Sequence, residues 1–250
     1  MKRALLSLAV CVFASTACHS LSAQDLPEPE TVLAKYVEAT GGKAKYQAIK
    51  TGQIKAKMSI PEANISGSIA INFDAKGRMY TKANLGQAGM IERGSNGKVV
   101  WEVSTLQGAR LLEGEEAEQM LDETNFDKLL SPEKKFKSMK TIGKSSVNGE
   151  ECYELQMTSK GGSVTNDFYS VKSGLKLKSV MEVATPMGKI KVETFPSNYK
   201  KSKNGITTAW ISEQKFGVMT QKMEVTSLEF NVDLDKKLFE LPQDIKDLID

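Results

Sequence analysis

The chain has 250 residues, 40% of them hydrophobic and 26% charged, and its 34 basic residues are nearly balanced by 31 acidic ones. That balance gives no global positive field for holding nucleic acid, and no base-reading motif is visible, so a nucleic-acid partner is not expected. The one histidine, His19, is a poor basis for a Ser-His-Asp or Cys-His catalytic site.

The N-terminus has the pattern of an export signal. Lys2 and Arg3 precede an apolar run over residues 4–13, which is too short to span a bilayer. Two cleavage sites compete. Small side chains before Gln24 favour cleavage after Ala23, which defines a signal peptide over residues 1–23 and a single domain over residues 24–250. The alternative is an imperfect lipobox that would make Cys18 a lipidated N-terminus. Both predict a periplasmic protein, in the second case anchored to the outer membrane.

Cleavage after Ala23 would also change the inventory of reactive side chains. It removes His19, Cys11 and Cys18 and leaves Cys152 as the only thiol. One cysteine without histidine can form neither an intramolecular disulfide nor a zinc site. We therefore expect no cofactor and no metal.

A first helix is predicted directly after this segment. Pro27 to Pro29 suit a helix start, and an apolar stripe at helical spacing follows over residues 32–37. Gly41 and Gly42 end it, since glycine suits the left-handed C-terminal position of a helix. A short second helix is predicted over residues 44–49.

From Gly52 to Val232 the chain reads as about a dozen short strands separated by turns rich in glycine and asparagine. A sheet with this many strands must curl, and the alternation predicts that the interior it encloses is apolar. The apolar parity changes between Met223 and Leu228, which predicts a β-bulge near Thr226 that bends the sheet toward closure.

The alternation is interrupted once, between Leu112 and Leu130, where apolar residues at helical spacing include Ala117, Met120, Leu121 and Thr124. One or two short helices are predicted here, ended by Ser131-Pro132. They either form a movable lid over the mouth of the curled sheet or are plain core helices. The tail after Pro242 is expected to be loosely held.

Methionine is frequent on the strands, and its flexible thioether suits a surface that accepts apolar partners of varying shape. The alternative is that these methionines only fill gaps in the core. If the interior binds a ligand, the inward-facing side chains predicted to contact it are Met58, Ile69, Ile71, Met90, Trp101, Met181, Val183 and Met223, with Met120 and Leu121 on the lid.

Charged residues give no competing site. The lysine clusters over residues 134–140 and 200–203 could meet anionic headgroups, but the favoured interpretation is that they keep strand edges soluble. The carboxylates are scattered and lack the loop spacing of a calcium site. An enzyme using them is the least favoured alternative.

Several spaced motifs occur along the chain. They are Ala39-Thr40-Gly41-Gly42, Asn96-Gly97 before Trp101, Val147-Asn148-Gly149 before Tyr153 and Leu155, Ser173-Gly174-Leu175, Asn204-Gly205-Ile206 after Tyr199, and Phe230-Asn231 before Asp235, Phe239 and Pro242. Together they resemble the outer-membrane lipoprotein-sorting-protein family, whose members include the periplasmic lipoprotein carriers.

The resemblance implies a mainly β fold, an open and strongly curved antiparallel half-barrel whose concave side is covered by helices. It also implies binding or transport of an acylated ligand, a lipid or lipoprotein, without catalysis. No arginine of this chain aligns with the lid-latching arginine of the carriers. The alternative function is a membrane-anchored scaffold or envelope sensor with a protein partner.

Overall fold

The computed structural model describes residues 26–249, except residues 123–126 and 186–187. The predicted signal segment, with Cys18 and His19, lies outside the described residues, as does Thr124. The described chain has no helix long and apolar enough to cross a membrane.

Thirteen strands form one sheet in which every strand is antiparallel to its neighbours. They are β1 (Thr51–Ile60), β2 (Ile65–Asp74), β3 (Met79–Asn84), β4 (Met90–Ser95), β5 (Val100–Ser104), β6 (Gly108–Leu112), β7 (Phe136–Val147), β8 (Glu150–Ser159), β9 (Val164–Ser170), β10 (Lys176–Thr185), β11 (Gly188–Lys201), β12 (Thr207–Phe216) and β13 (Met219–Phe230).

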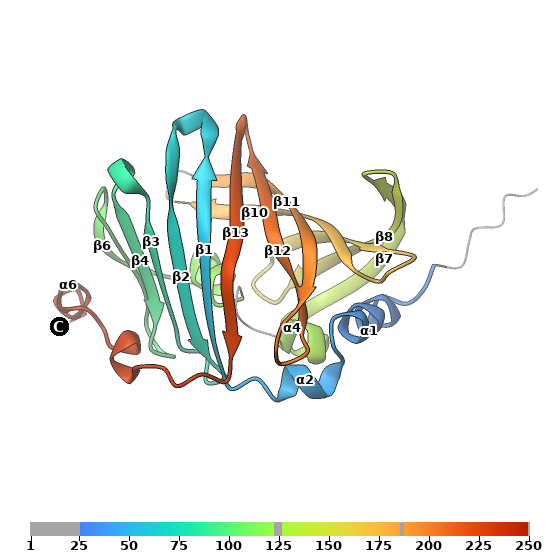
Figure 1. Ribbon diagram of the computed structural model, residues 1–250, viewed down its shortest axis with the longest axis horizontal. Coiled ribbons are helices and arrows are strands. Elements are labelled where there is room, and N and C mark those ends of the chain that lie inside the picture. Colours follow the sequence, from blue (N-terminus) through green and yellow to red (C-terminus); the bar gives the residue numbers. More distant parts are fainter. Residues whose placement is uncertain (1–25, 123–126, 186–187, 250) are drawn as a thin grey trace, which may run out of the picture.

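The strand order is β6-β5-β4-β3-β2-β1-β13-β12-β11-β10-β9-β8-β7, so the two ends of the chain's β region meet in the middle, where β1 pairs with β13. β6 and β7 are the two free edges. Figure 1 shows the strand direction turning from nearly upright in β1 to β4 to strongly inclined in β7 and β8. The predicted open half-barrel is confirmed.

The predicted bulge is also confirmed. Lys55 lies opposite Ser227 and Ala56 opposite Val225, which leaves Thr226 without a partner residue. The Thr226 hydroxyl donates instead to the Lys55 carbonyl at 3.1 Å. The bulge keeps Met223 and Leu228 on one face although the spacing between them is odd.

The described part of the chain has six α-helices beside the sheet. They are α1 (Pro29–Ala39), α2 (Lys43–Gln47), α3 (Gly114–Asp122), α4 (Asp127–Leu130), α5 (Pro132–Lys135) and α6 (Gln243–Lys246). α3 to α5 form the connection from edge strand β6 to edge strand β7, where helices are predicted. Ser131-Pro132 does not end this helical region, because Pro132 occupies the first turn of α5.

Helices α1 and α2 cover one face of the sheet, which we call the inner face. Val32 and Leu33 of α1 pack on Leu155 and Tyr169, while Val37 joins a second cluster that includes Phe73. The turn between the helices is fixed by Thr40, whose side chain is fully buried. Its hydroxyl donates to the Tyr36 carbonyl at 2.7 Å, and its own carbonyl accepts from the Thr207 amide at 2.8 Å.

The C-terminal segment packs on the opposite, outer face. Arg78, just before β3, has the same parity as Tyr80 of that strand, and its guanidinium lies 4.7 Å from the centre of the Phe239 ring in η3 (Lys236–Phe239). α6 contacts β6, and Ile245 is fully buried. The expectation of a loosely held tail is therefore wrong, because Ile245 anchors it in the fold.

Candidate functional site

The inner face carries the apolar surface that the sequence predicts. Met58 lies opposite Met223 across the β1–β13 pair, and Met181 and Val183 of β10 lie opposite Val192 and Ile190 of β11. Met181, Val183 and Met223 are half-buried. Ile190 and Met219, which have the same parity, are 42% and 40% exposed. Between these two groups the inner face of β12 has Ser212 opposite Met223 and Phe216 opposite Met219. The resulting apolar strip across the central strands is therefore interrupted by polar residues, and it is only partly covered.

The remaining predicted contacts divide into two groups. Ile69, Ile71, Met120 and Leu121 all belong to the cluster that joins the helices to the inner face, with Met120 and Ile71 among its buried members. α3 thus turns its apolar stripe toward the sheet, as the spacing predicts.

Met90 and Trp101, by contrast, lie on the outer face. Ile91 lies opposite Ala83, which lies opposite the inward-facing Ile69, so Met90 has the outward parity and is 39% exposed. Trp101 lies opposite Gly94, and its ring is 6.2 Å from that of Tyr80. The prediction that Met90 and Trp101 face the interior was wrong. An error of one residue in the alternation moves every side chain of a strand to the opposite face of the sheet.

Helix α3 is attached to the β6 side of the mouth by an ion-pair network. The Arg110 guanidinium makes two hydrogen bonds to the Glu116 carboxylate of α3, at 2.7 and 2.9 Å. Arg110 also donates to Glu102 at 2.9 Å, and Glu102 accepts from Arg93 at 2.5 Å. Glu102 is only 3% exposed. Arg93 and Arg110 neutralise its buried carboxylate on the inner face.

The other side of α3 is attached to the β8–β9 turn, β10 and β11. Glu115 pairs with Lys189 at 2.6 Å and accepts from the Ser163 hydroxyl at 2.7 Å. The Gln119 amide donates to the Glu182 carbonyl and accepts from the Ala184 amide, at 2.9 and 3.0 Å. α3 therefore bridges two distant parts of the sheet, and its polar contacts to both are made through side chains.

The electrostatics favour this arrangement near neutral pH. Burial raises the pKa of Glu102, but the hydrogen bonds and charges of Arg110 and Arg93 outweigh it, so the pKa is lowered. The pKa of Glu115 is lowered chiefly by Lys189 and then by Ser163. Because both pKa values fall on folding, the stabilisation is complete above the ordinary glutamate value of about 4.3 and is lost as pH falls through the lowered values.

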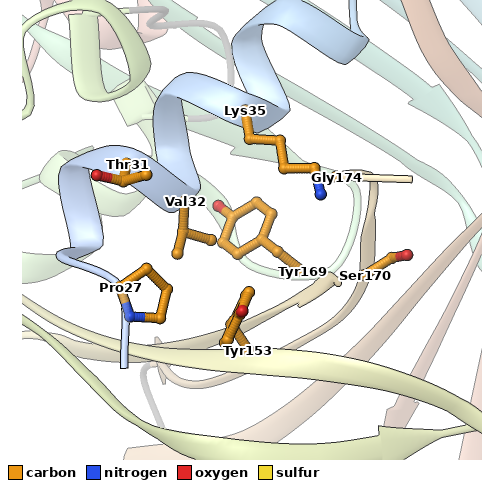
Figure 2. Close-up of a pocket in the computed structure, with 8 residues that line it drawn as sticks. All are labelled: Pro27, Thr31, Val32, Lys35, Tyr153, Tyr169, Ser170 and Gly174. Atoms are coloured by element: carbon orange, nitrogen blue, oxygen red, sulfur yellow. The ribbon is translucent and has the colours of Figure 1, made fainter. Parts of the chain in front are cut away.

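A cavity of about 190 Å³ lies between α1 and the strands beneath it (Figure 2). Its lining residues are Pro27, Thr31, Val32, Lys35, Tyr153, Tyr169, Ser170 and Gly174. The Tyr169 ring lies under α1 and its hydroxyl donates to Asp167 at 2.9 Å. Burial raises the pKa of Tyr169, so the phenol stays protonated.

A second cavity, of about 390 Å³, involves side chains of the outer face where β10 and β11 separate, between the β7–β8 turn and residues 195–199. Neither cavity is lined by Met58, Met181 or Met223. The first is smaller than the roughly 300–1,000 Å³ of typical ligand sites. α3 contacts β10 next to Met181 and Val183, the part of the apolar strip that lies beside this helix.

A metal site or a reactive thiol has less support in the structure. Among the residues that the structure describes, no three His, Cys, Asp or Glu side chains are grouped so as to hold a metal. Cys152 is buried, and burial together with the nearby Glu150 raises the pKa of its thiol. A raised pKa disfavours the reactive thiolate.

Three solved structures follow this fold over nearly their whole length. A LolA superfamily protein from Nitrosomonas europaea has a TM-score of 0.58 at 11% identity, covering 86% of this chain and 99% of its own. A DUF1329 family protein from Desulfovibrio piger has 0.57 at 16% identity, covering 86% and 98%. An outer membrane lipoprotein-sorting protein domain from Vibrio parahaemolyticus has 0.53 at 12% identity, covering 84% and 96%.

This is the LolA fold. The resemblance inferred from the spaced motifs is confirmed at that level. No protein-family model matches the chain, and no curated protein matches it in sequence. The sequence did not predict the site formed by Arg110, Glu102 and Glu116. No local pattern distinguishes these three charged residues, and only the strand register and the position of α3 bring them together.

Proposed function

We propose that the protein binds the acyl chains of a lipid or lipoprotein without catalysis, on the inner face beside α3. The observation that supports this most directly is the apolar strip through Met58, Met223, Met181 and Val183, which continues to the exposed Ile190 and Met219. Apolar side chains that stay partly exposed close to one another on one face are typical of a binding site.

Binding would proceed by displacement of α3. The helix is held over the mouth by Arg110 on one side and by Lys189 and Gln119 on the other, so opening would exchange side-chain contacts for water. Each CH₂ group transferred from water to the inner face contributes about 0.8 kcal/mol, so one acyl chain can offset the loss of several such contacts.

The test is uptake of a fluorescent fatty acid by wild type and by Met181→Glu and Met223→Glu. Both variants should bind at least about tenfold more weakly, because a carboxylate in the apolar strip loses hydration when the chain binds. Met90→Glu is the matched control, since it makes the same change on the outer face and should bind as wild type does. Thermal unfolding identifies any variant that fails to fold.

Two results would contradict the proposal. One is wild-type protein that takes up no fatty acid at any concentration of the probe. The other is an equal loss in all three variants, which would place the probe elsewhere. Lys135→Glu, on α5, should leave uptake unchanged and adds a second control.

The proposal includes export, with the acyl site acting in the periplasm. It is supported by Lys2, Arg3 and the short apolar run that follows them. Mass spectrometry of protein purified from cells should give an N-terminus at Gln24, or a diacylated Cys18 if the lipobox is used. A chain that still begins at Met1 would contradict export by either route.

A further inference from the structure

A basic surface, distinct from the acyl site, covers the end of the molecule formed by α1 and α2. Two turns adjoin these helices there: residues 171–174 between β9 and β10, and residues 202–206 between β11 and β12. The Lys35 ammonium donates to the Val171 carbonyl at 2.5 Å, and Lys45 donates to the Gly205 carbonyl at 3.5 Å. Figure 1 shows α1 and α2 at this end of the molecule, with α2 at the foot of the β11–β12 hairpin.

Six exposed lysines belong to this surface: Lys35, Lys43, Lys45, Lys172, Lys201 and Lys203. None of them forms an ion pair with another residue of the described chain. The two helices and two turns carry only two carboxylates, Glu30 and Glu38, both on α1. This end therefore has a local excess of positive charge, although the whole chain is nearly neutral.

The composition of the surface distinguishes between kinds of partner. Protein interfaces are enriched in arginine and aromatic residues and depleted in lysine, whereas this surface has lysine alone among its basic residues. Lysines that have no carboxylate partner suit a diffuse layer of negative charge, such as the headgroups of an anionic bilayer.

We infer that this end of the protein docks on an anionic phospholipid surface through Lys35, Lys43, Lys45, Lys172, Lys201 and Lys203. Each lysine near such a surface contributes enough that a pair of charge reversals lowers binding by at least about tenfold. The contact is electrostatic and weakens as salt is raised. It does not depend on acyl binding at the inner face.

The experiment is co-sedimentation of the exported chain, carrying Cys18→Ser to remove any acyl anchor, with lipid vesicles. Wild type should bind vesicles of mixed phosphatidylglycerol and phosphatidylcholine at low salt, lose that binding at high salt, and ignore vesicles of phosphatidylcholine alone. Lys43→Glu/Lys45→Glu on α2 and Lys172→Glu/Lys203→Glu in the turns should each bind at least about tenfold more weakly.

The matched control is Lys55→Glu/Lys57→Glu, an equal change of charge on exposed residues of the outer face of β1. It should sediment as wild type does. Equal losses in control and patch variants, equal binding to neutral vesicles, or capture by an acidic protein domain without vesicle binding would each overturn the inference. Fatty-acid uptake by Lys43→Glu/Lys45→Glu should remain normal, which separates failure of docking from failure of the acyl site.

Discussion

At the scale of single residues, two glycines make room for aromatic rings in the sheet. A Cβ atom on Gly94 would lie 2.4 Å from the Trp101 ring, and one on Gly52 would lie 2.3 Å from the Phe73 ring. Each glycine lies directly opposite its aromatic partner on the neighbouring strand. The pairs sit on opposite faces, with the Phe73 ring next to Gly52 on the inner face and the Trp101 ring next to Gly94 on the outer face.

Gly94→Ala should lower the free energy of unfolding by about 1–3 kcal/mol, because the added methyl group must displace the buried Trp101 ring. The control is Gly143→Ala in β7, where a Cβ atom would meet nothing within 4 Å. That change should be neutral or slightly stabilising, since alanine restricts the unfolded chain. Urea unfolding followed by tryptophan fluorescence measures both. Equal changes in the free energy of unfolding for the two variants would show that contact with the Trp101 ring does not restrict the side chain at position 94.

At the scale of elements, α3 is held differently from α1. α1 buries Val32, Leu33 and Val37, whereas Met120 is the one buried side chain among the described residues of α3, whose polar contacts reach both sides of the mouth. Segments with fewer buried apolar contacts open with lower free energy than those with more. α3 is thus the covering element best placed to move.

Arg110→Gln should release α3 from the β6 side, because Glu116 loses both hydrogen bonds and Glu102 keeps only Arg93. We expect faster amide exchange over residues 114–121 and a loss of about 1–3 kcal/mol in the stability of that segment. Arg78→Gln is the matched control, since Arg78 pairs with Asp74 on the outer face. Unchanged exchange in α3 after Arg110→Gln would show that the ion pair does not hold the helix.

Local sequence patterns predicted the elements well and the faces less well. Period-2 alternation identified the strands, and the odd spacing between Met223 and Leu228 located the bulge at Thr226. Alternation alone could not fix the face of Met90 and Trp101, because β4 and β5 are short and have apolar residues on both parities. The network of Arg110, Glu102 and Glu116 depends on pairing across strands, which no local pattern encodes.

At the scale of the whole molecule, each of the two faces has its own hydrophobic cluster. The inner clusters join α1 and α3 to the sheet, while the outer one gathers Val147, Cys152 and Phe168 beneath Lys178. The lysines of the basic end occupy exposed positions of α1, α2 and the adjoining turns, whereas the buried side chains of the same helices belong to the inner clusters. The two proposals therefore assign acyl binding and membrane docking to different surfaces, and we expect each to be lost without the other.

The free edges of the sheet have a further consequence. In a closed barrel, strand number and stagger fix the diameter. Here β6 and β7 are not neighbours in the hydrogen-bonded order, and the described residues between them include α3, α4 and α5. Strand number and stagger therefore do not fix the circumference of this sheet, and the proposed acyl ligands of different width would be accommodated by changes in side-chain contacts rather than in backbone hydrogen bonds.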